Sequence, residues 1–238
     1  MQMHNYMKKE PTIDGQLFSQ FGGAVLAKYT VGATEVENVT HLGVNRTSWM
    51  QLKTLFKMRP IKLDVKFRAK DIYTATVQKS QFDGRIFGQH ELWLPDGYFY
   101  TVYAESLGEA AVEADTDFGA IIGASYSFQG IRHGPLISLT IPAGGGTVNC
   151  LSTMPYTDAL FQCTVPMATP QYTLGGAVFA NVQAGEVLVI DGISKTILRN
   201  GQPNAMNVSW LNFPQLTPGL NTVSGTYPTI IQYYPTYI

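Results

Sequence analysis

The sequence has few charged residues. Aspartate, glutamate, lysine and arginine make up 14% of its 238 residues, against roughly 25% in a typical soluble domain, whereas apolar residues make up 45%. So little charge cannot coat the surface of a monomer. Either serine, threonine, asparagine and glutamine cover the surface, or part of it is buried in an assembly, and composition leaves both open. The net charge of −1 excludes the basic surface typical of sequence-specific nucleic-acid binding.

Long apolar runs are also missing. No stretch approaches the roughly 18 apolar residues that indicate a membrane-spanning helix. The amino terminus carries Lys8 and Lys9, but no apolar segment follows them, so we expect no signal peptide. We therefore expect synthesis in a cytoplasm and no membrane partner.

Cysteine and histidine are scarce. Cys150 and Cys163 are thirteen residues apart, on what we expect to be neighbouring strands, so either a disulfide or two buried thiols would fit. A cytoplasmic origin favours the reduced thiols. No spacing of cysteines and histidines is typical of a zinc site.

No residue pattern typical of catalysis is present. The glycines at 144–146 lack the lysine and hydroxyl residue of a phosphate-binding loop, and no Gly-x-Ser-x-Gly elbow occurs. Two carboxylate pairs, Glu91 with Asp96 and Glu186 with Asp191, are not set apart by spacing as a glycosidase would require. We expect no enzyme activity, no cofactor and no bound metal.

Periodicity predicts strands and a helix in residues 1–134. Trp49, Leu52 and Phe56 recur at helical spacing and predict a helix over 45–58 that Pro60 ends, and a weaker helix is expected around 72–80. Four apolar residues alternate with charged ones over 61–68 and predict a half-buried strand. Its charged face is either solvated or turned to a second copy or to the lumen of a ring.

The rest of this part predicts a hairpin and a long strand. A turn at 95–97 joins strands at 91–94 and 98–104, because Asp-Gly is typical of hairpin turns. Residues 105–117 are acidic and are expected to form a loop, and 120–132 alternate as a long strand.

Gly134-Pro135 marks a boundary, because short strands and glycine turns replace the helical signal beyond it. We expect a domain at 1–134 and a second one at 135–238. The second is predicted as a jelly-roll β-sandwich of the kind found in galectins and carbohydrate-binding modules, so the fold class is mainly β. Its predicted strands are 136–141, 147–151, 160–165, 172–180, 187–190, 196–199, 207–211 and 230–234.

The least generic stretch is 207–223, NVSWLNFPQLTPGLNTV, in which a strand with Trp210 runs into a Pro-Gly turn. Phe213, Leu216, Pro218, Gly219 and Asn221 have the spacing found in distal tail proteins of long-tailed bacteriophages. The Ile-Asp turn at 190–191, the Asn-Gly at 200–201 and the Pro-Tyr-rich end match the same order. The sequence therefore resembles this family, and the Asp-Gly turn and Phe-Gly near the amino terminus extend the resemblance to both ends.

The resemblance implies a structural role in the virion, at the tail tip. It implies that the first domain closes into a ring, usually a homohexamer, through which DNA passes without sequence-specific binding. The implied partners are the major tail tube protein, the tape measure protein, the tail-associated spike or lysin protein and a receptor-binding protein. The alternative is a carbohydrate-binding adhesion protein.

Two sets of side chains are candidates for contacts. We expect strand 61–68 and hairpin 93–103 to supply the ring interface, and aromatic residues near the carboxyl end to stack on sugars or pack on a partner. The candidate ring residues are Ile61, Leu63, Val65, Phe67, Trp93 and Tyr100. The candidate glycan or partner residues are Trp210, Tyr233, Tyr234 and Tyr237.

Overall fold

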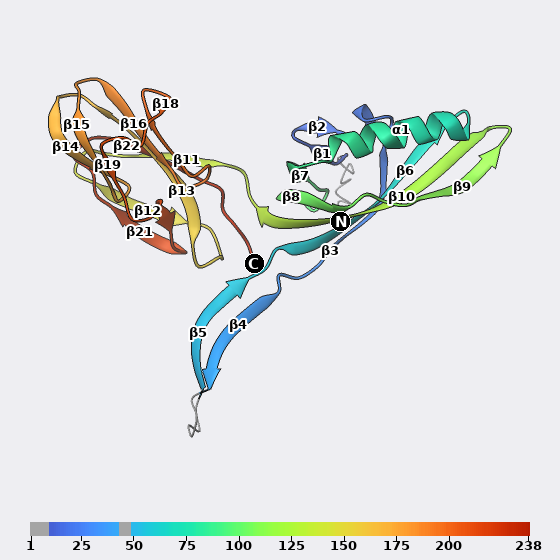
Figure 1. Ribbon diagram of the computed structural model, residues 1–238, viewed down its shortest axis with the longest axis horizontal. Helices are drawn as coiled ribbons and strands as arrows, with labels where there is room; N and C mark the ends of the chain where they lie inside the picture. Colours follow the sequence, from blue (N-terminus) through green and yellow to red (C-terminus); the bar gives the residue numbers. More distant parts are fainter. Residues whose placement is uncertain (1–9, 43–48) are drawn as a thin grey trace, which may run out of the picture. The chain divides into compact units, whose positions relative to one another are not determined.

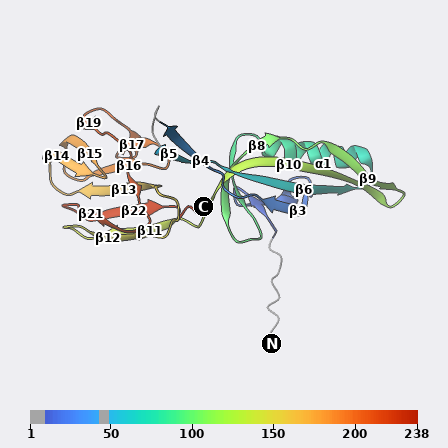
Figure 2. The same ribbon diagram turned by 90° about the horizontal axis from the view of Figure 1, so that it is seen from below.

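The computed structural model describes residues 10–42 and 49–238, and it divides the chain into two compact units that meet between Arg132 and His133. We call them unit 1 and unit 2 (Figures 1 and 2). Antiparallel strands dominate both, as the mainly-β prediction requires. No helix among the described residues is long and apolar enough to span a membrane.

Unit 1 contains a sheet of eight strands, a separate two-stranded hairpin and, among its described residues, one α-helix. The sheet order is β2-β1-β7-β8-β10-β6-β3, and β9 also pairs with β10. The elements are β1 (Thr12–Ile13), β2 (Gln16–Leu17), a 3-10 helix η1 (Phe18–Gln20), β3 (Val25–Val31), β4 (Val36–Leu42), β5 (Trp49–Phe56), β6 (Arg59–Ala69), α1 (Ile72–Arg85), β7 (Gln89–Trp93), β8 (Phe99–Ser106), β9 (Ala110–Thr116) and β10 (Gly119–His133).

The core of unit 1 lies between its sheet and α1, which runs across the sheet in Figure 1. The alternation of β6 has the predicted register, with its apolar residues buried. Asp71 caps α1 by accepting a hydrogen bond from the Thr74 N–H at 2.7 Å. The ring of Phe82 packs edge-on against Phe18 and Phe67 and tilted against Tyr126.

α1 also buries charge. Lys79 Nζ lies 2.7 Å from Asp83 Oδ2, and the Tyr126 hydroxyl donates to Asp83 Oδ1 at 2.7 Å. The Lys79 and Asp83 side chains are only 11% and 20% exposed. Burial, followed by the contact with Asp83, raises the pKa of Tyr126 well above its usual range, so its hydroxyl stays a donor.

The helix predicted at 45–58 is wrong. Residues 49–56 form β5, which pairs with β4 in an antiparallel hairpin, and 45–48 lie outside the described residues. Apolar residues at helical spacing do not exclude a strand when a second extended segment pairs with it, as Val36–Leu42 does here. Pro60 lies within β6 and ends no helix. The weaker helix signal at 72–80 is the one that forms, as α1.

The predicted acidic loop at 105–117 is also wrong, because residues 110–116 form β9 and pair with β10 across a bulge. β9 is almost wholly exposed, and its charges suit an edge strand. The hairpin of β7 and β8 and the long strand β10 agree with the predictions.

Unit 2 is a two-layered sandwich. One layer has the order β11-β22-β13-β16-β17-β18, with β20 also on β13, and the other contains the small sheets β12-β21 and β14-β15-β19. The strands are β11 (Ile137–Ile141), β12 (Gly146–Cys150), β13 (Thr157–Val165), β14 (Thr169–Leu174), β15 (Ala177–Val182), β16 (Glu186–Asp191), β17 (Thr196–Arg199), β18 (Gln202–Pro203), β19 (Val208–Ser209), β20 (Gln215–Leu216), β21 (Gly219–Val223) and β22 (Thr229–Tyr233).

Both small sheets cover the same face of the larger one. The Tyr233 hydroxyl donates to the carbonyl of Asn149 in β12 at 3.0 Å, and Cys163 Sγ lies 3.2 Å from the Tyr172 hydroxyl of β14. The core fills the space between the layers. Cys163 and Cys150 are both buried free thiols.

One predicted strand of unit 2, 172–180, is in fact a hairpin. Gly175 and Gly176 have φ of 56° and 86° and form the two-residue turn between β14 and β15. Two successive positive φ values are what a type I′ turn requires, and glycine adopts them without strain.

Candidate assembly and binding surfaces

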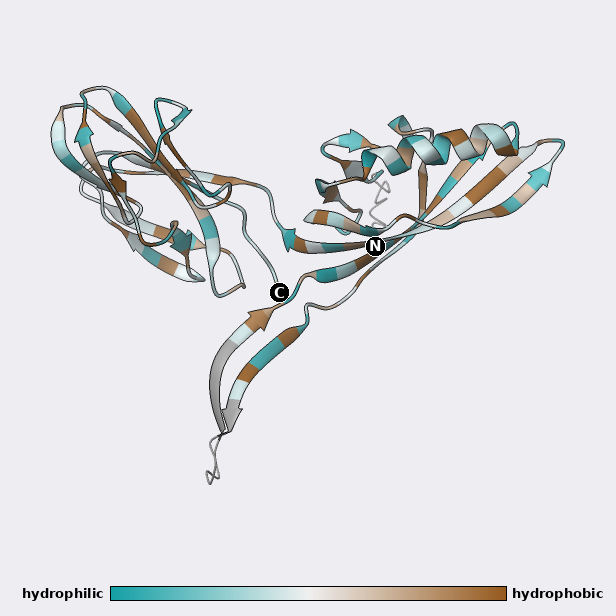
Figure 3. Ribbon diagram, in the orientation of Figure 1, coloured by the Kyte–Doolittle hydropathy of each residue, from teal (hydrophilic) through white to brown (hydrophobic). Residues whose placement is uncertain are grey.

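The hairpin of β4 and β5 is exposed in an unusual way. Within the described residues, the two strands pair only with each other. Every residue from 35 to 40 is exposed, so both faces of β4 meet solvent, including the side chains of Val36 and Val39. Figure 3 shows these apolar segments between polar ones on β4. Because an isolated two-stranded hairpin is at best marginally stable in water, this one needs a contact beyond itself.

The candidate ring residues lie mostly in the core. Ile61, Leu63, Val65, Phe67 and Tyr100 are each 0% exposed. A side chain with no exposed surface cannot contact a second copy while this fold is kept, so we assign these five to the core of unit 1. The burial of the first four was visible in the alternating pattern of β6, whereas Tyr100 lies on β8, and sequence reasoning wrongly gave all five an outer role as well. The sixth candidate, Trp93, is half-buried on β7.

The opposite face of β6 is polar and partly exposed. Lys66 pairs with Glu113 of β9, and Asp64 accepts a hydrogen bond from the Ser125 hydroxyl of β10 at 2.5 Å. These residues line a shallow hollow of about 430 Å³ with Lys28. This is the face of β6 that remains available to solvent or to a neighbour.

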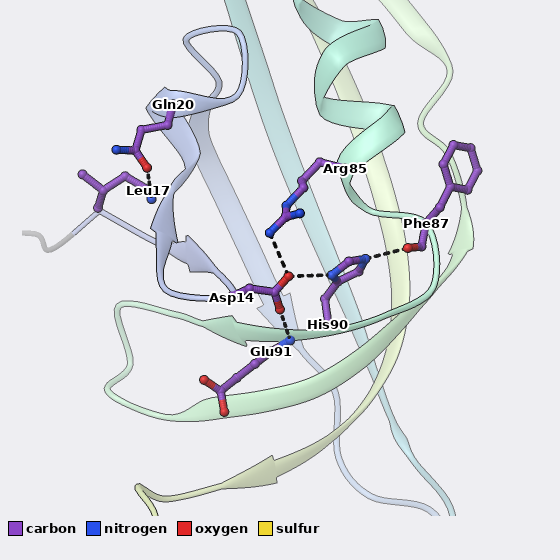
Figure 4. A network of polar contacts seen from close by, with 7 residues as sticks. All are labelled: Asp14, Leu17, Gln20, Arg85, Phe87, His90 and Glu91. Carbon is purple, nitrogen blue, oxygen red and sulfur yellow. Dashed lines mark hydrogen bonds and ion pairs between the residues drawn. The ribbon is translucent and has the colours of Figure 1, made fainter.

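A polar network fixes the amino-terminal strands of unit 1 (Figure 4). Asp14, in the turn between β1 and β2, accepts hydrogen bonds from Arg85 at 3.0 Å and from the Glu91 N–H at 2.9 Å. His90 Nδ1 lies 2.8 Å from Asp14 and its Nε2 lies 2.6 Å from the Phe87 carbonyl. Burial raises the pKa of Asp14, but these hydrogen bonds and charges outweigh it and lower the pKa overall. The network joins β1, the end of α1 and β7, which is a structural role.

The four candidate glycan residues do not form one surface. Tyr233 is fully buried, and its hydroxyl is engaged by β12. Tyr234 packs edge-on against His133, and Tyr237 is half-buried nearby. Trp210 is 41% exposed and lies 6.4 Å from Phe213, centroid to centroid. Of the four, only Trp210 is an exposed residue.

Sequence reasoning missed a hollow in unit 2. A cleft of about 940 Å³ opens between β14 and β21, bordered by Gln171 and Thr173 on one side and Thr222 on the other. Phe161 of β13 and Phe213, in the loop between β19 and β20, supply apolar surface. No charged residue lines the cleft among the described residues. The cleft exists because two strands do not pair, and a missing pairing leaves no periodic signal in the sequence.

In the described part of the chain, no group of histidine, cysteine, aspartate or glutamate residues could hold a metal ion. One carboxylate of each pair noted in the sequence also forms contacts within the fold. Asp96 accepts hydrogen bonds from the Tyr98 N–H and the Tyr100 hydroxyl, and Glu186 lies 3.5 Å from Arg199.

Comparison with solved structures identifies the architecture. The chain is similar to the crystal structure of SPP1 Dit (gp 19.1), which is described as a paradigm of hub adsorption apparatus in phages that infect Gram-positive bacteria. The TM-score is 0.70 and the identity 12%, over 97% of this chain and 100% of that one. The chain has the fold of a distal tail protein.

Two structures of the phage p2 baseplate in its activated conformation are more weakly similar to this chain. The one with Sr has a TM-score of 0.44 and 7% identity, over 90% of this chain and 91% of that one. The one with Ca has a TM-score of 0.49 and 6% identity, over 91% of each. No family model and no curated protein sequence matches the chain. The assignment of the distal tail fold therefore rests on structural similarity and not on sequence similarity. The same similarity confirms the predicted mainly-β class.

Proposed function

We propose that this protein is a structural hub of a phage tail tip, in which unit 1 forms a closed ring and unit 2 presents surfaces to other tail proteins. The likeness to the SPP1 hub protein over 97% of this chain and 100% of that one supports this proposal. The role is architectural, so the protein is a virion component without catalytic activity, synthesised in the host cytoplasm.

The observation that carries the proposal is the β4–β5 hairpin. A strand that is exposed on both faces, and that carries apolar residues on them, is stabilised when a neighbouring copy covers it. In a ring, each copy contacts the next copy through one surface and the previous copy through a different surface. Such contacts form a closed ring when the rotation from copy to copy adds up to a full turn. The low charge content agrees with surface that is covered in an assembly.

The ring we propose is six-fold, and its lumen passes DNA without reading its sequence. Above it we place the major tail tube protein, with the tape measure protein in the lumen. Below it we place the spike or lysin protein. A receptor-binding protein attached to unit 2 completes the set of proposed partners.

The test is the mass of the full-length protein in solution, with negative-stain imaging of the same sample. We expect rings with a central hole of roughly 20 Å or more, the width of a DNA duplex. Val39→Lys should yield folded monomers, because it places a charge on the apolar part of the hairpin. Met206→Lys, at a 77% exposed position of unit 2, should leave the rings intact. Rings that persist in Val39→Lys would remove the hairpin from the interface.

The second candidate function, carbohydrate-binding adhesion, rests on the partly exposed Trp210 beside Phe213. A glycan array with the full-length protein tests it. Binding that disappears in Trp210→Ala would support an adhesion role. If no glycan binds, the hub role is the only one of the two that remains.

A further inference from the structure

The second layer of unit 2 is interrupted. β12-β21 and β14-β15-β19 both cover the same face of the larger sheet, but β21 and β14 are not paired among the described strands. A continuous second layer would require a ladder between these two strands. The cleft of about 940 Å³ lies where that ladder is missing.

Antiparallel geometry determines which backbone groups of β14 face the cleft. Leu174 and Ala177 pair directly across the two-glycine turn, so the backbone N–H and C=O of Leu174 point to β15. Every second residue does the same, so Tyr172 also points its backbone groups to β15. Gln171 and Thr173 point theirs the other way, to the open edge. Consistent with this, Ala180, which lies opposite Gln171, donates its N–H away from β14, to the Asn207 carbonyl at 2.8 Å.

The same argument applies to β21. The Gly144 N–H donates to the Gly225 carbonyl at 2.8 Å, in register with the pairs that join β12 and β21. Counting in twos from Gly225, the backbone groups of Leu220 and Thr222 point away from β12. Each side of the cleft therefore presents an open strand edge.

Two polar side chains of the cleft are already engaged within the chain. Asn221 is engaged with the backbone of Thr217 and Gly219, and Gln215 donates to Asp158 at 2.9 Å. On the open edge of β14, the Gln171 carbonyl accepts a hydrogen bond from the Thr169 hydroxyl at 2.9 Å and keeps a second lone pair for a further donor. A sugar would need such amides and hydroxyls, whereas an extended peptide needs the edges.

We propose that this cleft is a docking slot for an extended, uncharged segment of another protein, which adds a strand between β14 and β21. Such a strand would lie about 4.8 Å from each edge and would exchange main-chain hydrogen bonds with both. Its inward side chains would be apolar and would contact Phe161 and Phe213. Its lack of charge matches the uncharged lining of the cleft. The slot does not depend on ring formation by unit 1.

The probes are nine-residue peptides with blocked ends, in which valine, isoleucine or phenylalanine alternates with serine or threonine. We would measure amide hydrogen exchange by NMR in the isotope-labelled full-length protein. A peptide that fills nine-tenths of the slots should slow exchange about tenfold at Gln171, Thr173, Leu220 and Thr222. The same peptide with every backbone amide N-methylated should not, because it keeps the side chains but loses the donors toward both edges.

Two variants separate edge pairing from side-chain binding. Thr173→Pro removes the edge N–H and should abolish the protection, and Thr222→Pro is the second such variant if the first does not fold. Thr173→Val keeps the N–H and should behave as the wild type. The proposal is overturned if no peptide of the panel protects these amides, if the methylated peptide protects equally, or if both proline variants still bind. Protection by maltohexaose or chitohexaose alone would also overturn it and would assign the cleft to sugars.

Discussion

The buried charge under α1 allows a sharp test of how unit 1 is stabilised. In Asp83→Asn the amide oxygen can still accept the Tyr126 hydrogen bond, but the negative charge beside Lys79 is lost. The ammonium group is then left with no compensating charge on a side chain that is 11% exposed. Breaking a buried ion pair from one side costs about 3–5 kcal/mol, and the partial exposure of both groups puts our expectation near 3 kcal/mol.

The companion variant is Lys79→Met with Asp83→Asn. It removes both charges and keeps an apolar stem of similar length on α1, so we expect a loss of only about 1 kcal/mol, since replacing both members of a buried pair is often nearly neutral. The free energy of unfolding would be measured in urea by hydrogen exchange, peptide by peptide. Strands of unit 2 in the same sample serve as the internal reference. If Asp83→Asn costs less than about 1 kcal/mol, or if the double variant loses as much as the single one, the reasoning fails.

Three further predictions concern local features. Gly22→Ala should destabilise unit 1 far more than Gly15→Ala in thermal unfolding: both have positive φ, but only at Gly22 would a Cβ lie 2.6 Å from a backbone oxygen of α1, whereas nothing lies within 4 Å at Gly15. The lowered pKa of Asp14 stabilises unit 1 above its ordinary pKa of 3.8, and this contribution should vanish as pH falls through the folded-state pKa; urea titrations should show no such loss in Asp14→Asn. Cys150 and Cys163 should react with a thiol reagent only when urea unfolds unit 2, and reaction in the native protein would contradict their burial.

The parts of the fold that the sequence predicted correctly are those with strong local patterns. The alternation in β6 fixes its buried face, and Asp96-Gly97 marks the hairpin of β7 and β8. The helix assignments were less successful. α1 has a weak signal because charged residues interrupt its inner face: Lys79 pairs with Asp83 one turn along the helix, and Asp83 also accepts the Tyr126 hydrogen bond.

Pairing and packing between separate elements account for the other errors. Whether residues 49–56 become a helix or a strand depends on their pairing with β4, which no local pattern records. The same holds for the candidate sites. Tyr233 belongs to an aromatic cluster in sequence, but its place on the inner face of β22 makes it a core residue. The cleft between β14 and β21 is defined by a missing pairing, so only the folded chain displays it.

The ends of unit 2 are tied to each other. His133, at its start, forms a bridge with Thr236, and the Gly134 N–H donates to the Pro235 carbonyl at 2.8 Å. A force that pulls unit 1 and the carboxyl terminus apart would therefore break these bonds one after another. It would not load all the hydrogen bonds of a ladder at the same time. The terminal segment would peel away at low force while the sandwich behind it stays folded, so this clasp would act as the mechanical weak point of unit 2.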